Sequence, residues 1–189
     1  MKKILSLFLT LWFCSSFLFA QSGTTLPPLD KSPMDMSYYP NNYPSLKIQG
    51  KITEPLAARV IYSRPQKSGR TIFGELVEYG KVWRMGANEA TEIEFFRHVR
   101  IGGKKIPKGR YTLYAIVYEN SWTIILNKDI DIWGAFKYDP KKDVVRVDVP
   151  VQKTSEVTEA LAMMFERTTD GTNLVIAWDT VKVALPITF

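Results

Sequence analysis

Short segments in which apolar and polar side chains alternate recur along most of this chain, and they limit the possible folds more than any other feature. Residues 91–101 alternate in this way, which is the period of a half-buried strand, and residues 145–151 repeat the pattern. Gly102-Gly103 supplies the positive φ angles that a tight hairpin needs. From Leu46 onward, about nine or ten short strands follow at roughly 8 to 12 residue spacing, with no convincing long helix and no internal repeat. The sequence predicts an all-β fold, an antiparallel β-sandwich that is jelly-roll-like or related.

Individual strands can be placed in the middle and at the end of the chain. Residues 111–118 are apolar on both faces, which indicates a central or covered strand. Residues 156–167 fit either a strand or a helix. A strand from Ala160 onward is favoured because Asp170-Gly171 would join it to the next strand in a hairpin. Alternation in residues 174–178 and 181–187 predicts the last two strands.

The first 20 residues have the features of a secretory signal peptide. Two lysines precede an apolar stretch from Ile4 to Phe19, and the small residue Ala20 comes before the polar Gln21. An uncleaved membrane anchor is the alternative, although the apolar run is short for a membrane span. We therefore expect an exported protein of the periplasm, the cell envelope or the extracellular space, with no membrane span after cleavage.

Cleavage after Ala20 would leave 189 − 20 = 169 residues, which fits one domain. Residues 21–45 are expected to form an extended tether rich in proline and tyrosine, and residues 46–189 a single sandwich domain. The aromatic part of this tether is expected to lie across the folded body. There Tyr38-Tyr39 could cover a site in this chain or in a neighbouring one, and the oligomeric state stays open. Loss of two lysines lowers the formal charge from +6 to +4, which does not indicate a nucleic-acid partner.

The residue inventory excludes several kinds of chemistry. The chain has one histidine, His98, and one cysteine, Cys14, which falls in the predicted signal peptide. A His/Cys zinc site, a thiol nucleophile and a disulfide are therefore excluded from the mature chain. The sequence contains no Gly-x-Ser-x-Gly elbow and no nucleotide-binding glycine loop, and His98 is expected to face solvent. The oxygen-bearing residues 127–131 lack the spacing of an EF-hand and predict a plain turn, so we expect no metal and no cofactor.

Residues 80–91 concentrate side chains that suit a binding site at an irregular corner between strands. The candidate ligand-binding residues are Arg70, Trp83, Arg84, Asn88 and Glu89. Arginine side chains grip carboxylate or phosphate in a two-pronged fashion, so convergence of Arg64, Arg70 and Arg84 would form an anion site. The alternative is that each arginine pairs with a nearby glutamate, Glu75, Glu78 or Glu89, and fixes a loop.

The aromatic and polar residues of this region also allow two interpretations. Trp83, Trp133 and Tyr79 could form a platform for sugar rings, whereas burial in the core is the alternative for Trp83. Asn88 could satisfy backbone groups of the corner or contact a ligand. Glu89 is the only plausible acid or base in the corner, and the sequence places no second carboxylate beside it. No catalytic residue is therefore assigned.

A series of motifs resembles a known family. The motifs are Tyr62-Ser63-Arg64-Pro65, Gly69 to Gly74, Tyr79 to Thr91, Ile101 to Lys105, Pro107 to Tyr111, Trp122 to Ile125 and Trp133-Gly134. In this order they resemble the secreted bacterial family known as domain of unknown function 2911, from about Lys47 to the C-terminus. The family usually carries threonine where this chain has Met85. The resemblance implies an exported β protein and implies no activity.

Three functions remain open from the sequence. The first is an exported binding module for a polar or anionic small molecule or a glycan. The second is a structural or interaction protein of the cell envelope, in which the corner only holds the sheets together. The third is a hydrolase that uses Glu89.

Overall fold

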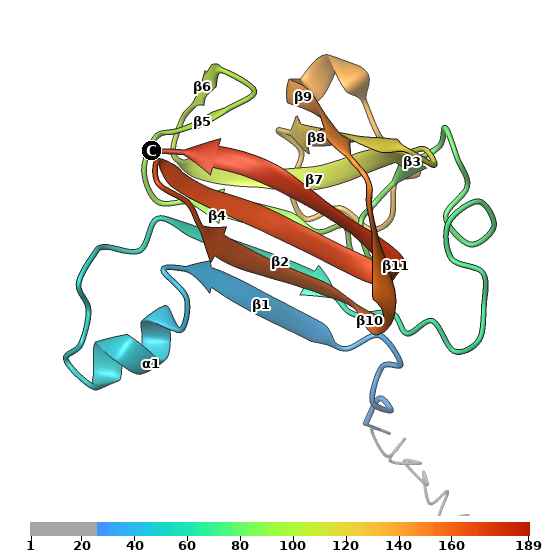
Figure 1. Ribbon diagram of the computed structural model, residues 1–189, viewed down its shortest axis with the longest axis horizontal. Helices are drawn as coiled ribbons and strands as arrows, with labels where there is room; N and C mark the ends of the chain where they lie inside the picture. Colours follow the sequence, from blue (N-terminus) through green and yellow to red (C-terminus); the bar gives the residue numbers. More distant parts are fainter. Residues whose placement is uncertain (1–25) are drawn as a thin grey trace, which may run out of the picture.

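The computed structural model describes residues 26–189, so the predicted signal peptide lies outside the described part of the chain. Two antiparallel sheets stack face to face, with β10 and β11 in front of β2, β4 and β7 (Figure 1). This arrangement confirms the predicted β-sandwich. The elements are β1 (Met34–Tyr39), α1 (Tyr43–Ile48), β2 (Ala58–Ser63), β3 (Val82–Trp83), β4 (Glu92–Phe95), β5 (Val99–Ile101), β6 (Lys104–Ile106), β7 (Gly109–Val117), β8 (Ser121–Asn127), the 3-10 helix η1 (Pro140–Lys142), β9 (Asp143–Pro150), β10 (Gln152–Arg167) and β11 (Gly171–Thr188).

The larger sheet has the order β1-β2-β4-β7-β8-β9, and β3 pairs with β7 outside this path. The strand β7 is buried along most of its length, as its two apolar faces predicted. One edge is β1, which pairs with β2 from Met34 opposite Ser63 to Tyr39 opposite Ala58. The tether expected over residues 21–45 therefore includes a strand of the sheet and the beginning of α1. Its aromatic residues lie against the body because their backbone joins the sheet.

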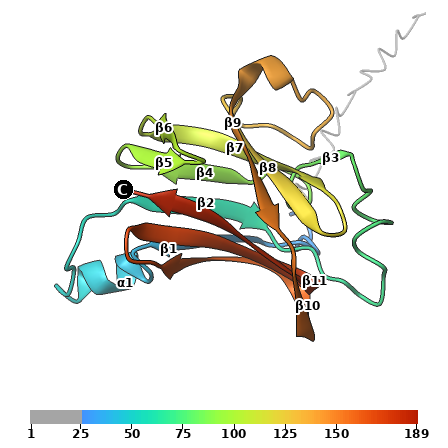
Figure 2. The same ribbon diagram turned by 45° about the horizontal axis from the view of Figure 1, so that its top comes forward.

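The smaller sheet has the order β10-β11-β5-β6. β10 and β11 form the hairpin predicted at Asp170-Gly171, with Arg167 opposite Thr172. β11 runs to the right in Figure 1, turns and returns to the C-terminus, and Figure 2 shows the same two arms. The turn contains Asp179 at φ 55°, and Phe189 N–H donates to Asp170 O at 3.2 Å where the arms meet. These two arms are the two last strands that the sequence predicted.

A single apolar core fills the space between the sheets. Its largest fully buried side chains include Trp122, Trp178, Phe95 and Phe165, and the described residues 26–189 contain no cysteine. Full burial of an aromatic or large aliphatic side chain contributes about 1.5–3 kcal/mol each. Packing of apolar side chains from both sheets therefore holds the two layers together.

The strand predicted over residues 91–101 is two strands in the structure. β4 belongs to the larger sheet and β5 to the smaller one, and the chain bends at Phe96-Arg97, where the side chains are exposed. Alternation continues across the bend because β4 and β5 line opposite sides of the same core, which is how a sandwich corner is built. His98 lies in this bend and is exposed, as expected.

The ambiguous residues 156–167 are a strand, which confirms the favoured interpretation. The strand β10 begins earlier than Ala160, at Gln152. Its first half is mostly exposed, so it lacks the apolar alternation that would identify a strand in the sequence.

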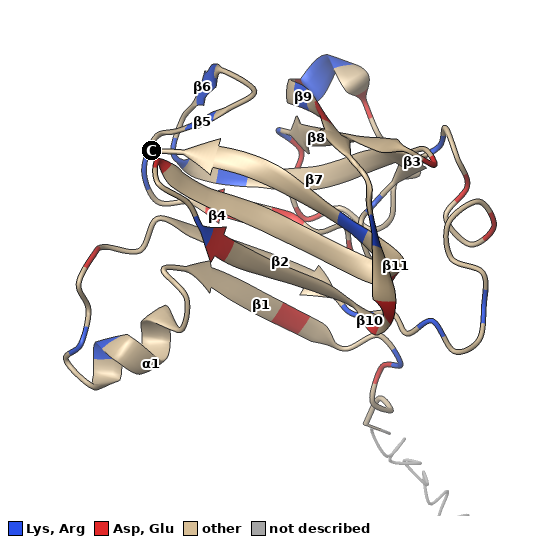
Figure 3. Ribbon diagram, in the orientation of Figure 1, with Lys and Arg blue, Asp and Glu red and all other residues tan. Residues whose placement is uncertain are grey.

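Figure 3 shows positions of Lys and Arg and positions of Asp and Glu scattered among one another along the ribbon. Such mixing is ordinary for a protein surface and creates no large field of one sign. Within residues 26–189, no helix has the length and apolar character needed to cross a membrane.

Candidate functional site

A small pocket, here called the inner pocket, opens where the loop between β2 and β3 meets the corner after β3. Its volume is about 170 Å³. The residues that line it are Ser32, Pro65, Arg70, Leu76, Val77, Trp83, Arg84, Gly86, Ala87 and Trp178. Three of the five candidate residues, Arg70, Trp83 and Arg84, thus share one cavity. This volume is below the roughly 300–1,000 Å³ of sites for drug-sized ligands, so a bound molecule must be compact.

The corner that carries Arg84 is held by two buried hydroxyl groups. The Ser63 hydroxyl accepts from Ala87 N and donates to Ala87 O, both at 2.6 Å. On the other side, Thr91 Oγ1 donates to Met85 O at 2.7 Å. A Cβ on Gly86 would lie 2.7 Å from Ser63 Oγ, so this position needs glycine. The corner has a fixed backbone because its polar groups are paired inside the protein.

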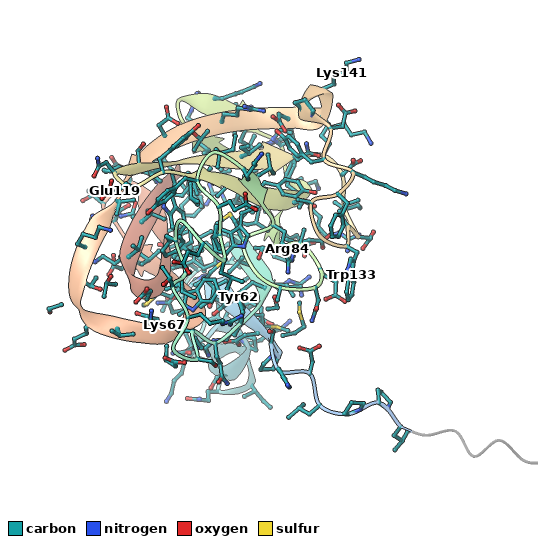
Figure 4. The ribbon with its side chains drawn as sticks, turned by 90° about the vertical axis from the view of Figure 1, so that its right-hand side faces the viewer. Tyr62, Lys67, Arg84, Glu119, Trp133 and Lys141 are labelled. Atoms are coloured by element: carbon teal, nitrogen blue, oxygen red, sulfur yellow. The ribbon has the colours of Figure 1, made fainter. Side chains whose placement is uncertain are left out.

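Arg84 is the unusual residue of the inner pocket. Its side chain is half-buried, and its Nε is fully buried without a hydrogen-bond acceptor. Within residues 26–189 no carboxylate forms an ion pair with it. Burial lowers the pKa of the Arg84 guanidinium below its usual value, although the group stays charged at neutral pH. Arg84 is labelled in Figure 4, and it lines the inner pocket together with Arg70, Leu76 and Val77 of the loop that joins β2 and β3.

Tryptophan rings form the apolar wall of the pocket. Trp83 and Trp178 stack with ring centroids 6.0 Å apart and an interplanar angle of 17°. Trp122 meets Trp83 edge-on at 5.7 Å. Trp83 is only 7% exposed, so most of its ring belongs to the core and a limited surface faces the pocket. By contrast, Trp133 and Tyr79 are exposed and do not line this pocket, and Trp133 lies at the edge of the molecule in Figure 4.

The three arginines considered together in the sequence do not all converge. Arg64 donates to Leu161 O at 3.0 Å and pairs with Asp35 at 3.1 Å, and it does not line the pocket. Arg70 is exposed at the pocket, and its guanidinium donates to Lys67 O at 3.0 Å and to Gln66 O. Neither pairs with Glu75, Glu78 or Glu89 in the described structure. Arg70 and Arg84 therefore bring two positive charges to one cavity.

Asn88 and Glu89 lie outside the inner pocket. Asn88 has φ 57°, its Nδ2 donates to Asp30 Oδ2 at 3.0 Å, and its carbonyl accepts from Gly134 N at 2.9 Å. It therefore joins the N-terminal segment and the loop after β8 to the corner. Glu89 lines a different cavity of about 140 Å³, with Glu92 and Asp131 among its neighbours. Arg110 holds those two carboxylates at 3.3 Å and 2.8 Å, which leaves no pair of free carboxyl groups around Glu89.

We expect Asn88→Ala to lower the free energy of unfolding by about 1–2 kcal/mol, because alanine is disfavoured in the left-handed region and loses the bond to Asp30. Asn88→Gly is the matched control, since it loses the same bond without the backbone penalty. Thermal denaturation of both variants checks this prediction. Equal losses of stability in the two variants would show that the loss comes from the bond to Asp30 and not from the backbone conformation.

Several lining residues could not be assigned from the sequence. Trp178 comes from β11, Ser32 from the segment before β1, and Leu76 and Val77 from the loop before β3. Nothing in their local pattern separates them from core or loop residues. Only the folded arrangement of the sheets and their connecting segments brings them together.

Residues 127–131 form a turn whose oxygen atoms bond to protein donors. Asn127 Oδ1 accepts from Asp129 N at 2.9 Å, and the Asp129 carboxylate pairs with Lys142 at 2.6 Å. The Asp131 carboxylate pairs with Arg110. Between residues 26 and 189, no group of three His, Cys, Asp or Glu side chains is arranged to hold a metal ion.

Fold and site together define a β-sandwich protein with a compact pocket that combines tryptophan and arginine. Residues 44–187 match the model of a family described as a protein of unknown function, DUF2911. The chain belongs to this family, which confirms the resemblance seen in its motifs. No curated protein and no solved structure matches the chain.

Proposed function

We propose that this protein is an exported binding module that takes a small anion with an apolar part into the inner pocket. Export is inferred from the signal-peptide pattern in residues 1–20. One observation carries the binding proposal, namely that the Arg84 side chain lines the inner pocket while its buried Nε has no acceptor within the described chain. Buried polar groups are nearly always hydrogen-bonded, so an unpaired arginine donor at a pocket favours a ligand that supplies the acceptor.

The pocket walls favour an anion that also has an apolar part. Leu76, Val77 and Pro65 line the cavity with the two stacked tryptophans. An anionic group would reach Arg84 while the apolar part contacts these side chains. A carboxylate suits this geometry because guanidinium groups bind it in two-pronged fashion. The small volume and the burial of Trp83 favour such a compact anion over a glycan.

The direct test is an NMR titration with butyrate and benzoate, with butyramide and benzamide as uncharged controls. We expect the carboxylates to shift the Arg84 Nε–H and the indole signals of Trp83 and Trp178, and the amides to leave them unchanged. Arg84→Gln should weaken carboxylate binding about tenfold to hundredfold, since a hydrogen bond to a charged group is worth about 1.5–3 kcal/mol.

Arg100→Gln is the matched control, because Arg100 lies in β5 and does not line the inner pocket. It should leave carboxylate affinity unchanged. Equal binding of carboxylates and amides, or full affinity in Arg84→Gln, would contradict the proposal.

A further inference from the structure

A second, wider cavity adjoins the inner pocket and is here called the outer basin. Its volume is about 400 Å³, and it is lined by Lys31, Ser32, Gln66, Ser68 and Arg70. Ser32 and Arg70 line both cavities, so the two are neighbours that share a wall. The inner pocket is lined by aromatic and aliphatic side chains around Arg84, whereas every residue of the outer basin is polar. One ligand could therefore occupy both cavities if it has a charged group at each end and an apolar segment between them.

Two cations that line the outer basin, Lys31 and Arg70, form no ion pair in the described chain, although the Arg70 guanidinium donates to two backbone carbonyls. Lys67 is engaged, since it pairs with Asp179 at 2.9 Å and donates to Arg70 O at 2.8 Å.

The nearby acids are already bonded to donors of the protein. Glu159 Oε1 accepts from Ser68 N at 2.7 Å. The two Asp30 oxygens accept from Ser32 N at 2.6 Å and from Asn88 Nδ2 at 3.0 Å. The outer basin thus presents positive charge from Lys31 and Arg70 beside acids that are already hydrogen-bonded.

We propose that the ligand carries two anionic groups joined by an apolar linker. One group binds Arg84 in the inner pocket, the linker passes Pro65 and the tryptophan wall, and the second group lies in the outer basin near Arg70 and Lys31. Dicarboxylates with an aliphatic chain are the simplest members of this class. The inference rests on the proposed function, because it requires that Arg84 binds the first group.

The test compares dicarboxylates with monocarboxylates of the same chain length by isothermal titration calorimetry. The pairs are adipate with hexanoate and suberate with octanoate. We expect the better-fitting dicarboxylate to bind the native protein about tenfold more tightly than its monocarboxylate partner, because a second charge pair forms. The preference should fall as salt concentration rises, since Lys31 and Arg70 are exposed.

Substitutions in the outer basin test whether the second anionic group of the ligand binds there. Lys31→Gln and Arg70→Gln should each reduce the preference for the dicarboxylate, and the double variant should abolish it. Lys31 is exposed and lines only the outer basin, so Lys31→Gln keeps the test valid if Arg70→Gln disturbs its loop. Arg100→Gln should retain the full preference.

The outcomes separate this inference from the proposed function. If the native protein binds each dicarboxylate and its monocarboxylate partner with equal affinity, the inference of a ligand with two anionic groups is wrong, whereas the proposed Arg84 site is unaffected. A dicarboxylate preference that survives in the double variant would also overturn the inference. Failure of every carboxylate to bind would instead reject the proposed function.

Discussion

Arg84→Met should raise the free energy of unfolding by about 1–2 kcal/mol and should at the same time abolish carboxylate binding. Methionine retains much of the arginine stem, and it removes a buried donor that has no acceptor in the protein. For a chain of this size the gain corresponds to a rise in Tm of about 2–8 °C, measured by differential scanning calorimetry without ligand.

Arg59→Met is the matched control for this stabilisation. Arg59 also has a buried Nε without an acceptor, but its guanidinium pairs with Glu94 across β2 and β4. Its replacement should not stabilise the protein, because Glu94 would lose its partner. A drop of several degrees for Arg84→Met would mean that Arg84 supports the corner, and it would favour the structural role over the binding role.

Gly171→Ala should lower the free energy of unfolding by about 3 kcal/mol, the largest loss that we expect from a single methyl group in this fold. A Cβ at this position would lie 2.2 Å from Ile187 O and 2.9 Å from Thr188 Cα, both backbone atoms of the returning arm of β11. The arms would have to separate where Phe189 N–H bonds to Asp170 O. Chemical denaturation gives the free energy, and the expected fall in Tm is about 6–12 °C.

Gly103→Ala controls for the loss of glycine itself. Gly103 lies in the β5–β6 hairpin at φ 76°, and a Cβ there would meet nothing within 4 Å. This variant should lose only about 1 kcal/mol, from the left-handed backbone. Similar losses of unfolding free energy in Gly171→Ala and Gly103→Ala would show that the close approach of the two β11 arms does not cause the loss at Gly171.

Local alternation was sufficient to predict most of the strands. The hairpins at Gly102-Gly103 and Asp170-Gly171 and the covered strand β7 follow from turn residues and apolar faces. The division between β4 and β5 could not be predicted, because a chain that changes sheets around one core keeps the same alternation. β1 was also missed as a strand, since pairing with β2 overrides the irregular composition of its segment.

The site could be predicted only in part. Arg70, Trp83 and Arg84 do line one pocket, as their chemistry suggested. Asn88 and Glu89 follow directly in the sequence, yet the chain turns through Met85 and Asn88, both at positive φ, and carries them toward Asp30 and a different cavity. Ser63, which fixes the corner, belonged to a motif but gave no sign of its bonds to Ala87.

The inner pocket draws its walls from nearly the whole length of the chain, from Ser32 before the first strand to Trp178 in the last one. Synthesis proceeds from the N-terminus. A nascent chain that already contains Arg70 and Arg84 therefore still lacks Trp178, whose ring stacks on Trp83. If the proposed function holds, a ligand can meet the complete inner pocket only after the chain has been made as far as Trp178 and β11 has packed in place. Under that proposal, binding would report that this last strand had folded.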